Sequence, residues 1–300
     1  MNRSRSLAVT LPQARSHVAD FISLTKPRLL LMVLLSTLAG FYLASPAGVQ
    51  AARAVSLVLG MALAAGGALA LNQYLERDVD ALMERTRRRA LPDGRLQPEE
   101  ALAFGSVLAL GGVAVLALGV NATCAVVTAA STAGYLFAYT PLKRRSALCS
   151  IVGGIPGALP PVAGWAAARA SLDLEAWVLF AILFLWQMPH SLAIARLYRA
   201  DYERAGLQVL PVIDPSGRST DRQIVAHSLA LLAVGQLPTI IGLAGPVYFC
   251  VALILGLGLL GFGLNLALTR SEDGARRVLF ASLVYLPVLL VVMTLDRVPL

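Results

Sequence analysis

Long apolar blocks recur along the whole of this 300-residue chain. Each is close to the roughly 20 residues that an α-helix needs to cross the hydrocarbon core of a bilayer. Inside a bilayer every backbone polar group must be satisfied within the protein, so blocks of this kind form helices. We therefore predict an all-α polytopic membrane protein with nine transmembrane helices. The predicted spans are 29–46, 54–75, 101–119, 122–141, 149–168, 174–194, 224–243, 246–268 and 278–295.

The composition excludes an ordinary soluble domain. Hydrophobic residues make up 57% of the chain and charged residues only 14%, whereas soluble domains carry roughly 25% charged residues. A net charge of +8 would suggest nucleic acid as a partner of a soluble chain. In a membrane protein the excess of basic residues has a topological cause, because Lys and Arg gather in cytoplasmic loops. We expect the lipid bilayer as a partner and no nucleic acid.

The basic residues also predict an orientation. With the N-terminus in the cytoplasm, all of the 25 Lys and Arg residues except Arg53, Arg169 and Arg297 fall in cytoplasmic segments. This agrees with the positive-inside rule for nine spans. We expect residues 1–28 to form a cytoplasmic segment, 29–295 the membrane domain and 296–300 a short tail. The N-terminus lacks the apolar core of a cleavable signal, and we expect a multi-pass protein of the bacterial inner membrane.

Acidic residues gather on the same predicted side, in the loops 76–100 and 201–221. The positive-inside rule does not require this, since carboxylates contribute little to topology. In the first loop, Asn72, Glu76 and Asp80 are spaced by four residues and fall on one face of a helix. Two carboxylates and one amide oxygen are ligands that suit Mg²⁺. Asp78 points to another face and is expected to support the site from outside. The alternative interpretation of the whole stretch is a solvated, frayed helix end.

Two further loops carry polar side chains to the same predicted side. The stretch WQMPHSLAIARLYRADYERAGLQVLPV (186–212) contains His190 and Arg196 near the end of the sixth span, followed by Asp201 and Tyr202. The stretch YTPLKRR (139–145) groups three cations after a proline. A packing histidine, an interfacial arginine and a topological signal are the simpler interpretations. Together the three loops place oxygen ligands beside fixed cations, which suits a diphosphate bridged by Mg²⁺ with a lipid-like tail between the helices.

These stretches resemble the UbiA superfamily of intramembrane prenyltransferases and, within it, the branch that farnesylates haem. The resemblance covers residues 24–212, and the last third is similar only as further apolar helices. It is carried by LTKPRLLLMVLLSTLAG, NQYLERDVDALMERTRRRALPDGRL, YTPLKRR, GGIPGALPPVAGWAA and WQMPHSLAIARLYRADYERAGLQVLP.

The resemblance implies a nine-helix bundle over residues 29–295 whose central cavity opens toward the cytoplasm. It implies transfer of the farnesyl group of farnesyl diphosphate to a vinyl group of haem B, with addition of water, to give haem O. Haem B would be a substrate rather than a cofactor, and a terminal-oxidase assembly or haem A synthase would be a partner. Asn72, Glu76 and Asp80 would bind Mg²⁺ and act in catalysis.

The resemblance also implies substrate contacts. The residues expected around the substrates are Arg89, Tyr139, Lys143, Arg144, Arg145, His190, Arg196, Asp201 and Tyr202. The basic members would surround the diphosphate, and His190 and Arg196 would hold the haem through iron or propionate. The second acidic motif of the superfamily has two aspartates, whereas here Asp201 stands with Tyr198 and Tyr202. That difference leaves open whether a second Mg²⁺ is bound.

Two alternatives remain open at this point. One is a UbiA-type enzyme acting on an aromatic acid or a quinone precursor. The other is a secondary transporter, which also combines charges with broken helices. Transporters place their binding sites near the middle of the bilayer, whereas the charged loops here are predicted to lie at one face.

Overall fold

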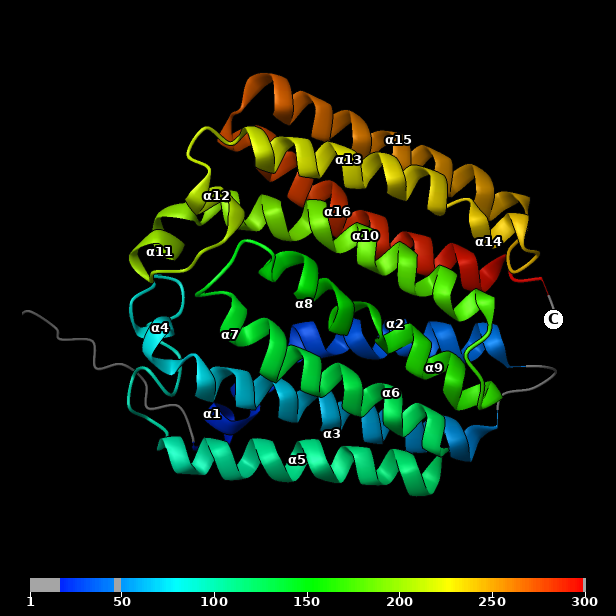
Figure 1. The fold of residues 1–300 in the computed structure, drawn as a ribbon. Helices are drawn as coiled ribbons and strands as arrows, with labels where there is room; N and C mark the ends of the chain where they lie inside the picture. Colours follow the sequence, from blue (N-terminus) through cyan, green and yellow to red (C-terminus); the bar gives the residue numbers. More distant parts are fainter. Residues whose placement is uncertain (1–16, 46–49, 299–300) are drawn as a thin grey trace, which may run out of the picture.

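The computed structural model describes residues 17–45 and 50–298, and these form one bundle of long helices (Figure 1). Within the described residues, nine helical stretches are long and apolar enough to cross a membrane, which confirms the predicted fold class. Six of them are single helices. They are α2 (Pro27–Ala44), α3 (Ala51–Leu75), α5 (Pro98–Gly119), α10 (Leu174–Leu197), α15 (Pro246–Thr269) and α16 (Glu272–Leu295).

The other three spans are composite. The fourth comprises α6 (Ala122–Ala133), a π-helical turn η1 (Gly134–Tyr139) and α7 (Thr140–Leu142). The fifth comprises α8 (Cys149–Ala158) and α9 (Pro160–Arg169), and the seventh α13 (Arg218–Val234) and α14 (Leu237–Ile240). Four short helices lie outside the spans. They are α1 (His17–Leu24), α4 (Arg77–Ala81), α11 (Arg199–Arg204) and α12 (Leu210–Ile213).

The broken fifth span has a direct cause in the sequence. Pro160 and Pro161 stand at the start of α9, immediately after Leu159, where α8 and α9 meet. Proline lacks the backbone N–H that would continue the helix ladder and its ring clashes with the preceding turn. The prolines therefore account for the break between α8 and α9.

Two helix starts differ from the prediction by six residues. The seventh span was expected to start at residue 224 and the ninth at 278, but α13 begins at Arg218 and α16 at Glu272. Hydropathy detects only the part of a helix that lies in hydrocarbon. The first turn of α16 instead carries signals of a water-exposed start, because the Ser271 side chain accepts the Gly274 N–H and Glu272 lies in the first turn.

The short helices α4, α7, α11 and α12 lie together at one end of the bundle (Figure 1); this end is called the charged end below. The segments predicted to face the cytoplasm therefore lie together, while the side of the membrane that they face stays a prediction. Along the outer edges, α5 packs beside α3 on one side and α15 beside α13 on the other. Large side chains fill the interior between these edges, among them Trp165, Tyr248 and Tyr285.

The contact between α3 and α5 is made by small residues. Gly67 faces the backbone of Ala109, and Gly112 faces the backbone of Ala64, in an antiparallel register. A Cβ atom at either glycine would overlap the backbone nitrogen of the facing alanine. Small residues let transmembrane helices approach closely, because association in lipid depends on van der Waals packing rather than on the hydrophobic effect. This contact holds α3, whose end carries the predicted ligands, in place.

Candidate functional site

The side chains of Asn72, Glu76 and Asp80 project from one side of the chain at the junction between α3 and α4. Glu76 ends α3 and precedes α4, yet the helical ladder continues across the junction. The Glu76 N–H donates to the Asn72 carbonyl at 3.0 Å, and the Asp80 N–H donates to the Glu76 carbonyl at 2.8 Å. The four-residue spacing therefore keeps the three side chains on one face. Asn72 and Asp80 are buried, and the Glu76 side chain is 14% exposed.

Each of the three oxygen groups is matched by a cation from another part of the chain. Lys26 Nζ donates to Asn72 Oδ1 at 3.3 Å. Lys143 Nζ donates to both carboxylate oxygens of Glu76, at 2.7 and 3.0 Å.

Arg89 completes the set of cations. Its guanidinium lies 2.6 Å from Asp80 Oδ2, and the Asp80 side chain is only 3% exposed. The result is a polar cluster in which three cations face two carboxylates and one carboxamide. We call these six residues the charged cluster.

Lys26 is held toward the cluster by an unusual backbone. It lies between α1 and α2 with a φ of 47°, in the left-handed region, directly before Pro27. For a residue other than glycine this conformation is strained, and such strain gathers at functional sites. Two contacts fix the junction: Gln73 Nε2 donates to the Leu24 carbonyl at 2.7 Å, and Asp20 in α1 is ion-paired with Arg95 at 3.2 Å.

The π-helical turn η1 supplies the opposite wall. Asn72 Nδ2 donates to Thr140 Oγ1 at 3.1 Å, and that hydroxyl donates to the Tyr135 carbonyl at 2.8 Å. Lys143 Nζ lies 4.4 Å from the centre of the Tyr139 ring, within the range of a cation–π interaction. Isolated π-turns are frequent at functional sites. Here the turn brings Tyr135, Tyr139 and Thr140 to the same side as the charged cluster.

The electrostatics of the cluster favour an added anion. Burial of the ammonium group lowers the pKa of Lys26 to about 7, and the charges of Arg89 and Lys143 act in the same direction. Burial also disfavours the charge of Lys143, but Tyr139 and Glu76 beside it raise its pKa above the ordinary value. A cation whose charge is disfavoured by two neighbouring cations is stabilised by an anion that all three can share.

The second charged loop reaches the first one. The Asp201 carboxylate accepts the Arg85 N–H at 3.4 Å and is ion-paired with Arg204. Tyr202 packs in the same cluster as Val79 and Met83, which flank Asp80 in the sequence. Asp201 and Tyr202 thus lie beside the segment that follows α4.

Three predicted residues lie toward solvent. Arg144 and Arg145 are exposed in the turn after α7. The Asp78 side chain is 78% exposed and faces Arg77 at 3.9 Å. Within residues 17–45 and 50–298, none of the three forms a side-chain hydrogen bond or ion pair with the charged cluster.

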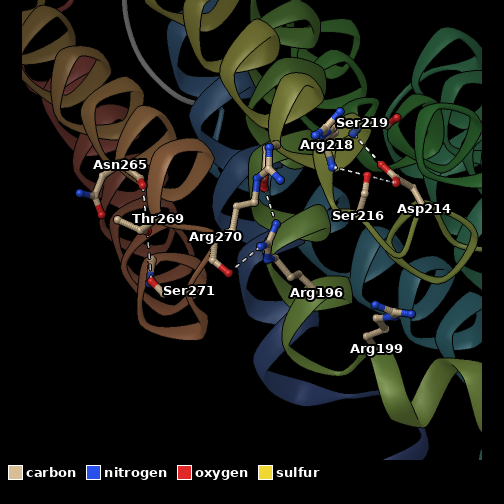
Figure 2. A network of polar contacts seen from close by, with 12 residues as sticks. Arg196, Arg199, Asp214, Ser216, Arg218, Ser219, Asn265, Thr269, Arg270 and Ser271 are labelled. Atoms are coloured by element: carbon tan, nitrogen blue, oxygen red, sulfur yellow. Dashed lines mark hydrogen bonds and ion pairs between the residues drawn. The ribbon is translucent and has the colours of Figure 1, made fainter.

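His190 and Arg196 are directed to other parts of the bundle. His190 Nδ1 lies 2.9 Å from Ser282 Oγ on α16, and its ring stacks on Trp186 at 4.9 Å. Arg196 is ion-paired with Asp221 on α13, and its guanidinium donates to the Arg270 carbonyl at 2.9 Å (Figure 2). The structure therefore does not bring these two residues to the charged cluster.

An apolar cavity of about 120 Å³ lies along the same side of α3, further from the charged end. Ala68 and Leu69 line it one turn before Asn72, and Met61 lines it three turns before. Tyr135 lines the cavity as well and accepts the hydroxyl of Thr140 through its carbonyl. A single ligand with a charged head group and an apolar tail could place the head at the charged cluster and the tail in the cavity.

The donor set of the cluster fits a magnesium ion. No three His, Cys, Asp or Glu side chains converge on a metal position within 17–45 and 50–298. Mg²⁺ does not need such a cage, because it is usually held by one or two carboxylates together with substrate phosphates and water. Glu76 and Asp80 supply two carboxylates, and Asn72 supplies an amide oxygen. Three cations beside them provide partners for the phosphates.

Sequence reasoning left out two members of this arrangement. Lys26 was counted only as a topological signal, although a lysine directly before a proline at the start of a span is an unusual position. Thr140 was passed over inside YTPLKRR, and nothing in its residue type indicates a partner 68 positions away. Lys26 belongs to the charged cluster and Thr140 borders it, both through contacts between distant segments.

Comparisons with known proteins identify the family of this chain. Residues 33–284 match the model of the UbiA prenyltransferase family. The chain is 47% identical over 287 residues to Protoheme IX farnesyltransferase of Solibacter usitatus, covering 93% of this chain and 98% of that one. It is 43% identical over 293 residues to Protoheme IX farnesyltransferase of Myxococcus xanthus, covering 97% and 98%.

Solved structures share the fold at low sequence identity. Digeranylgeranylglyceryl phosphate synthase matches with a TM-score of 0.79 and 13% identity, covering 94% of this chain and 99% of that one. A UbiA homologue from Archaeoglobus fulgidus bound to GPP and Mg²⁺ matches with a TM-score of 0.66 and 16% identity, covering 92% and 99%. The family match extends over most of the chain and the relatives over nearly all of it, so this protein belongs to the UbiA prenyltransferase family.

Proposed function

We propose that this protein transfers the farnesyl group of farnesyl diphosphate to a vinyl group of haem B, with addition of water, to give haem O. The observation that carries the proposal is the charged cluster beside the apolar cavity on the same side of α3. Relatives at 47% and 43% identity over nearly the whole chain carry the name Protoheme IX farnesyltransferase, which supports the choice of prenyl donor and acceptor.

Asn72, Glu76 and Asp80 would hold Mg²⁺, which when bound offsets the negative charge of the diphosphate. Lys26, Arg89 and Lys143 bind diphosphate oxygens through N–H donors that already point into the cluster. Arg89 can engage two oxygens at once, whereas the lysines act as point charges. These fixed donors stabilise the charge that develops on the leaving group as the allylic C–O bond breaks.

The cavity binds the hydrocarbon part of the donor. Its wall is almost entirely apolar and is built by side chains of α2, α3, α6, α8 and α9. Such a wall excludes water from the allylic carbon, so that the cation formed there reacts with the acceptor rather than with solvent. Tyr135 and Tyr139, stacked at 5.6 Å between cavity and cluster, place aromatic faces where positive charge develops.

The proposal also includes the residues that were predicted from the sequence but do not belong to the charged cluster. We propose Arg144 and Arg145 as exposed cations that attract the diphosphate, Asp201 and Tyr202 as substrate contacts, and Asp78 as an outer support. The proposed location is a bacterial inner membrane with the charged end facing the cytoplasm, supported by the distribution of Lys and Arg. A terminal-oxidase assembly or haem A synthase is the proposed recipient of the product.

For the acceptor, the prediction remains that His190 and Arg196 contact haem iron or propionate. Both side chains are engaged with Ser282 and Asp221, so haem binding by them requires an exchange of partners. His190→Ala is expected to shift the Soret band of bound haem, and Arg196→Ala to weaken haem binding about tenfold, the loss of one charge-assisted hydrogen bond. Unchanged spectra and affinities in both variants would remove these residues from the haem site.

One assay separates the proposed function from its alternative within the family. Membranes containing the protein are given Mg²⁺, farnesyl diphosphate and either haem B or 4-hydroxybenzoate, and the products are identified by mass. Haem O is the expected product. Prenylated hydroxybenzoate without haem O would assign the protein to an aromatic acceptor instead, and membranes without the protein serve as the control.

Lys26 gives a prediction for the diphosphate site. Lys26→Ala is expected to lower kcat/KM for farnesyl diphosphate about 100-fold, because a charge-assisted contact to the phosphate is lost inside a partly buried site. Lys26→Arg should recover part of the loss. Arg28, two residues further on and exposed, provides the matched control, and Arg28→Ala is expected to stay within twofold of wild type. Equal kinetics for Lys26→Ala and Arg28→Ala would exclude Lys26 from the site.

Met61 gives a prediction for chain length. The 11 residues from Asn72 to Met61 correspond to about 16 Å of helix, and three isoprene units, with four chain carbons each at bonds of roughly 1.5 Å, extend about 15 Å. Met61 is 3% exposed and accepts the Thr128 hydroxyl at 3.3 Å. We expect Met61→Ala to raise the ratio of geranylgeranyl to farnesyl transfer by at least about tenfold.

The control for this prediction is Met293→Ala. Met293 is fully buried in α16 and does not line the cavity, so its truncation costs packing without changing the tail site. The two diphosphates compete in one reaction mixture, and the products are compared by mass. If the ratio of geranylgeranyl to farnesyl transfer were the same in Met61→Ala and Met293→Ala, Met61 would not set the chain length of the prenyl group.

A further inference from the structure

A second charged feature lies at the charged end, away from the cluster and on the outer edge of the bundle. A groove of about 720 Å³ runs between α13 and α15. The part nearest the charged end, called the upper part, is lined by Arg218, Arg222 and Arg270. The lower part, further along the two helices, is lined by apolar side chains such as Val225 and Leu264. Since α13 and α15 belong to candidate membrane spans, we expect the arginines to lie at the membrane surface and the apolar side chains in the hydrocarbon region.

The upper part of the groove carries more positive than negative charge. Asp221 is the acid that lines it, and this carboxylate is already ion-paired with Arg196 and lies 3.8 Å from Arg270. Within the described parts of the chain, the side chains of Arg218 and Arg222 form no hydrogen bond or ion pair. Asp221 is thus paired with Arg196 and Arg270, while Arg218 and Arg222 have no carboxylate partner among the described residues. The carboxylate of Asp214, another acid nearby, accepts hydrogen bonds from the Ser216 hydroxyl and the Ser219 N–H (Figure 2).

The placement of the arginines is unfavourable without an anion. Arg218 is the first residue of α13, a helix of 17 residues, and Arg222 follows one turn later. The N-terminal end of a helix carries partial positive charge, so cations there are destabilised and anions are stabilised. The groove thus joins a helix N-terminus with three guanidinium groups.

Arg270 is held in position by its own backbone. It caps the end of α15 with a φ of 51°, a strained conformation for a residue other than glycine. Its carbonyl accepts a hydrogen bond from Arg196 at 2.9 Å, as Figure 2 shows. The guanidinium of Arg270 is therefore directed across the groove toward α13 and Asp221.

The lower part of the groove determines the kind of ligand. Leu264 and Ala226 are exposed on the outer surface of two membrane spans, where lipid chains are the surrounding medium. An inorganic anion would leave this apolar wall unused. We propose that the groove binds a phospholipid with an anionic headgroup, whose phosphate contacts Arg218, Arg222 and Arg270 and whose acyl chain lies against Val225 and Leu264. Basic pockets between membrane helices are known to take such headgroups.

The test is native mass spectrometry of the full-length protein purified in detergent. Phosphatidylglycerol and cardiolipin are titrated against phosphatidylcholine of the same chain length. We expect the anionic lipids to bind at least about tenfold more tightly. Each arginine near an anionic headgroup contributes about 1 kcal/mol, so Arg222→Gln should weaken binding about fivefold and the Arg218→Gln/Arg222→Gln pair about thirtyfold.

Arg277→Gln is the matched control. Arg277 is an exposed arginine at the charged end, in the first turns of α16, and it does not line the groove. Its loss should leave lipid affinity unchanged. Equal weakening in Arg277→Gln and in the double variant would show a general charge effect and overturn the proposal. Competition by inorganic phosphate as strong as that by the lipid would assign the groove to a free anion and also overturn it.

Discussion

Asp80→Asn is expected to lower farnesyl transfer by about 10³-fold while the protein still inserts into the membrane. The substitution keeps the size of the side chain and removes its charge. Asp80 is a buried carboxylate that lies 2.6 Å from Arg89 and on the same face as Glu76 and Asn72. Loss of one group that stabilises developing charge in a preorganised site costs about 10²–10³ in rate, and replacement of a carboxylate ligand of magnesium by a neutral amide adds to that.

The control for Asp80→Asn is Asp78→Asn. It is the same chemical change two residues away, on a side chain that is 78% exposed and has no contact with Asn72, Glu76 or the other described members of the charged cluster. Its activity should remain within about threefold of wild type, the range of surface effects. Similar rates for the two variants would mean that the face carrying Asn72, Glu76 and Asp80 is not the site of the reaction.

A second measurement separates catalysis from folding. Asp80→Asn leaves Arg89 without its carboxylate, and an unpaired charge in a partly buried site lowers stability. The double variant Asp80→Asn/Arg89→Gln removes both charges and should recover thermal stability. It should not recover activity, because the carboxylate and the guanidinium are then both absent. Recovery of activity together with stability would indicate a purely structural role for the pair.

Gly112→Leu is expected to destabilise the protein by about 3 kcal/mol or more, the upper part of the range for overpacking. A Cβ at this position overlaps the backbone nitrogen of Ala64 across the α3–α5 contact. Backbone atoms cannot move aside as a flexible side chain can, so the two helices must separate along their length. The separation also shifts the end of α3, and activity should fall with stability.

The adjacent Gly111 provides the control. A Cβ there meets no atom within 4 Å, and Gly111→Leu makes the same change in helix propensity as Gly112→Leu. Its effect should stay within about 1 kcal/mol. Thermal unfolding in detergent, followed by the loss of the monodisperse peak in size-exclusion chromatography, measures both variants. Equal midpoints would show that close packing of α3 on α5 does not limit stability.

Much of the fold follows from patterns that are local in the sequence. Blocks of about 20 apolar residues have one solution in a bilayer, and all nine predicted spans are present among the described residues. The alignment of Asn72, Glu76 and Asp80 required only the periodicity of a helix. The boundaries of α13 and α16 were less well predicted, because their first turns are polar and lie beyond the apolar block.

The partners of the site residues could not be predicted in the same way. Lys143 was expected near the acids, but its pairing with Glu76 joins residues 67 positions apart. Arg196 was expected near a substrate, whereas the structure pairs it with Asp221 on α13. A basic side chain at a helix end has many possible acidic neighbours, and only the packing of the helices selects one.

By itself, the sequence determined the helical spans, the separation of charge to one end and the face of α3 that presents oxygen ligands, because length, charge and periodicity act within a single segment. The tertiary structure decided that Lys26, Arg89 and Lys143 meet that face and that α2, α3, α6, α8 and α9 enclose a cavity beside it. These features depend on which helices pack together and how closely. That choice is made by the shapes of surfaces far apart in the sequence, such as Gly67 and Gly112 against their facing alanines.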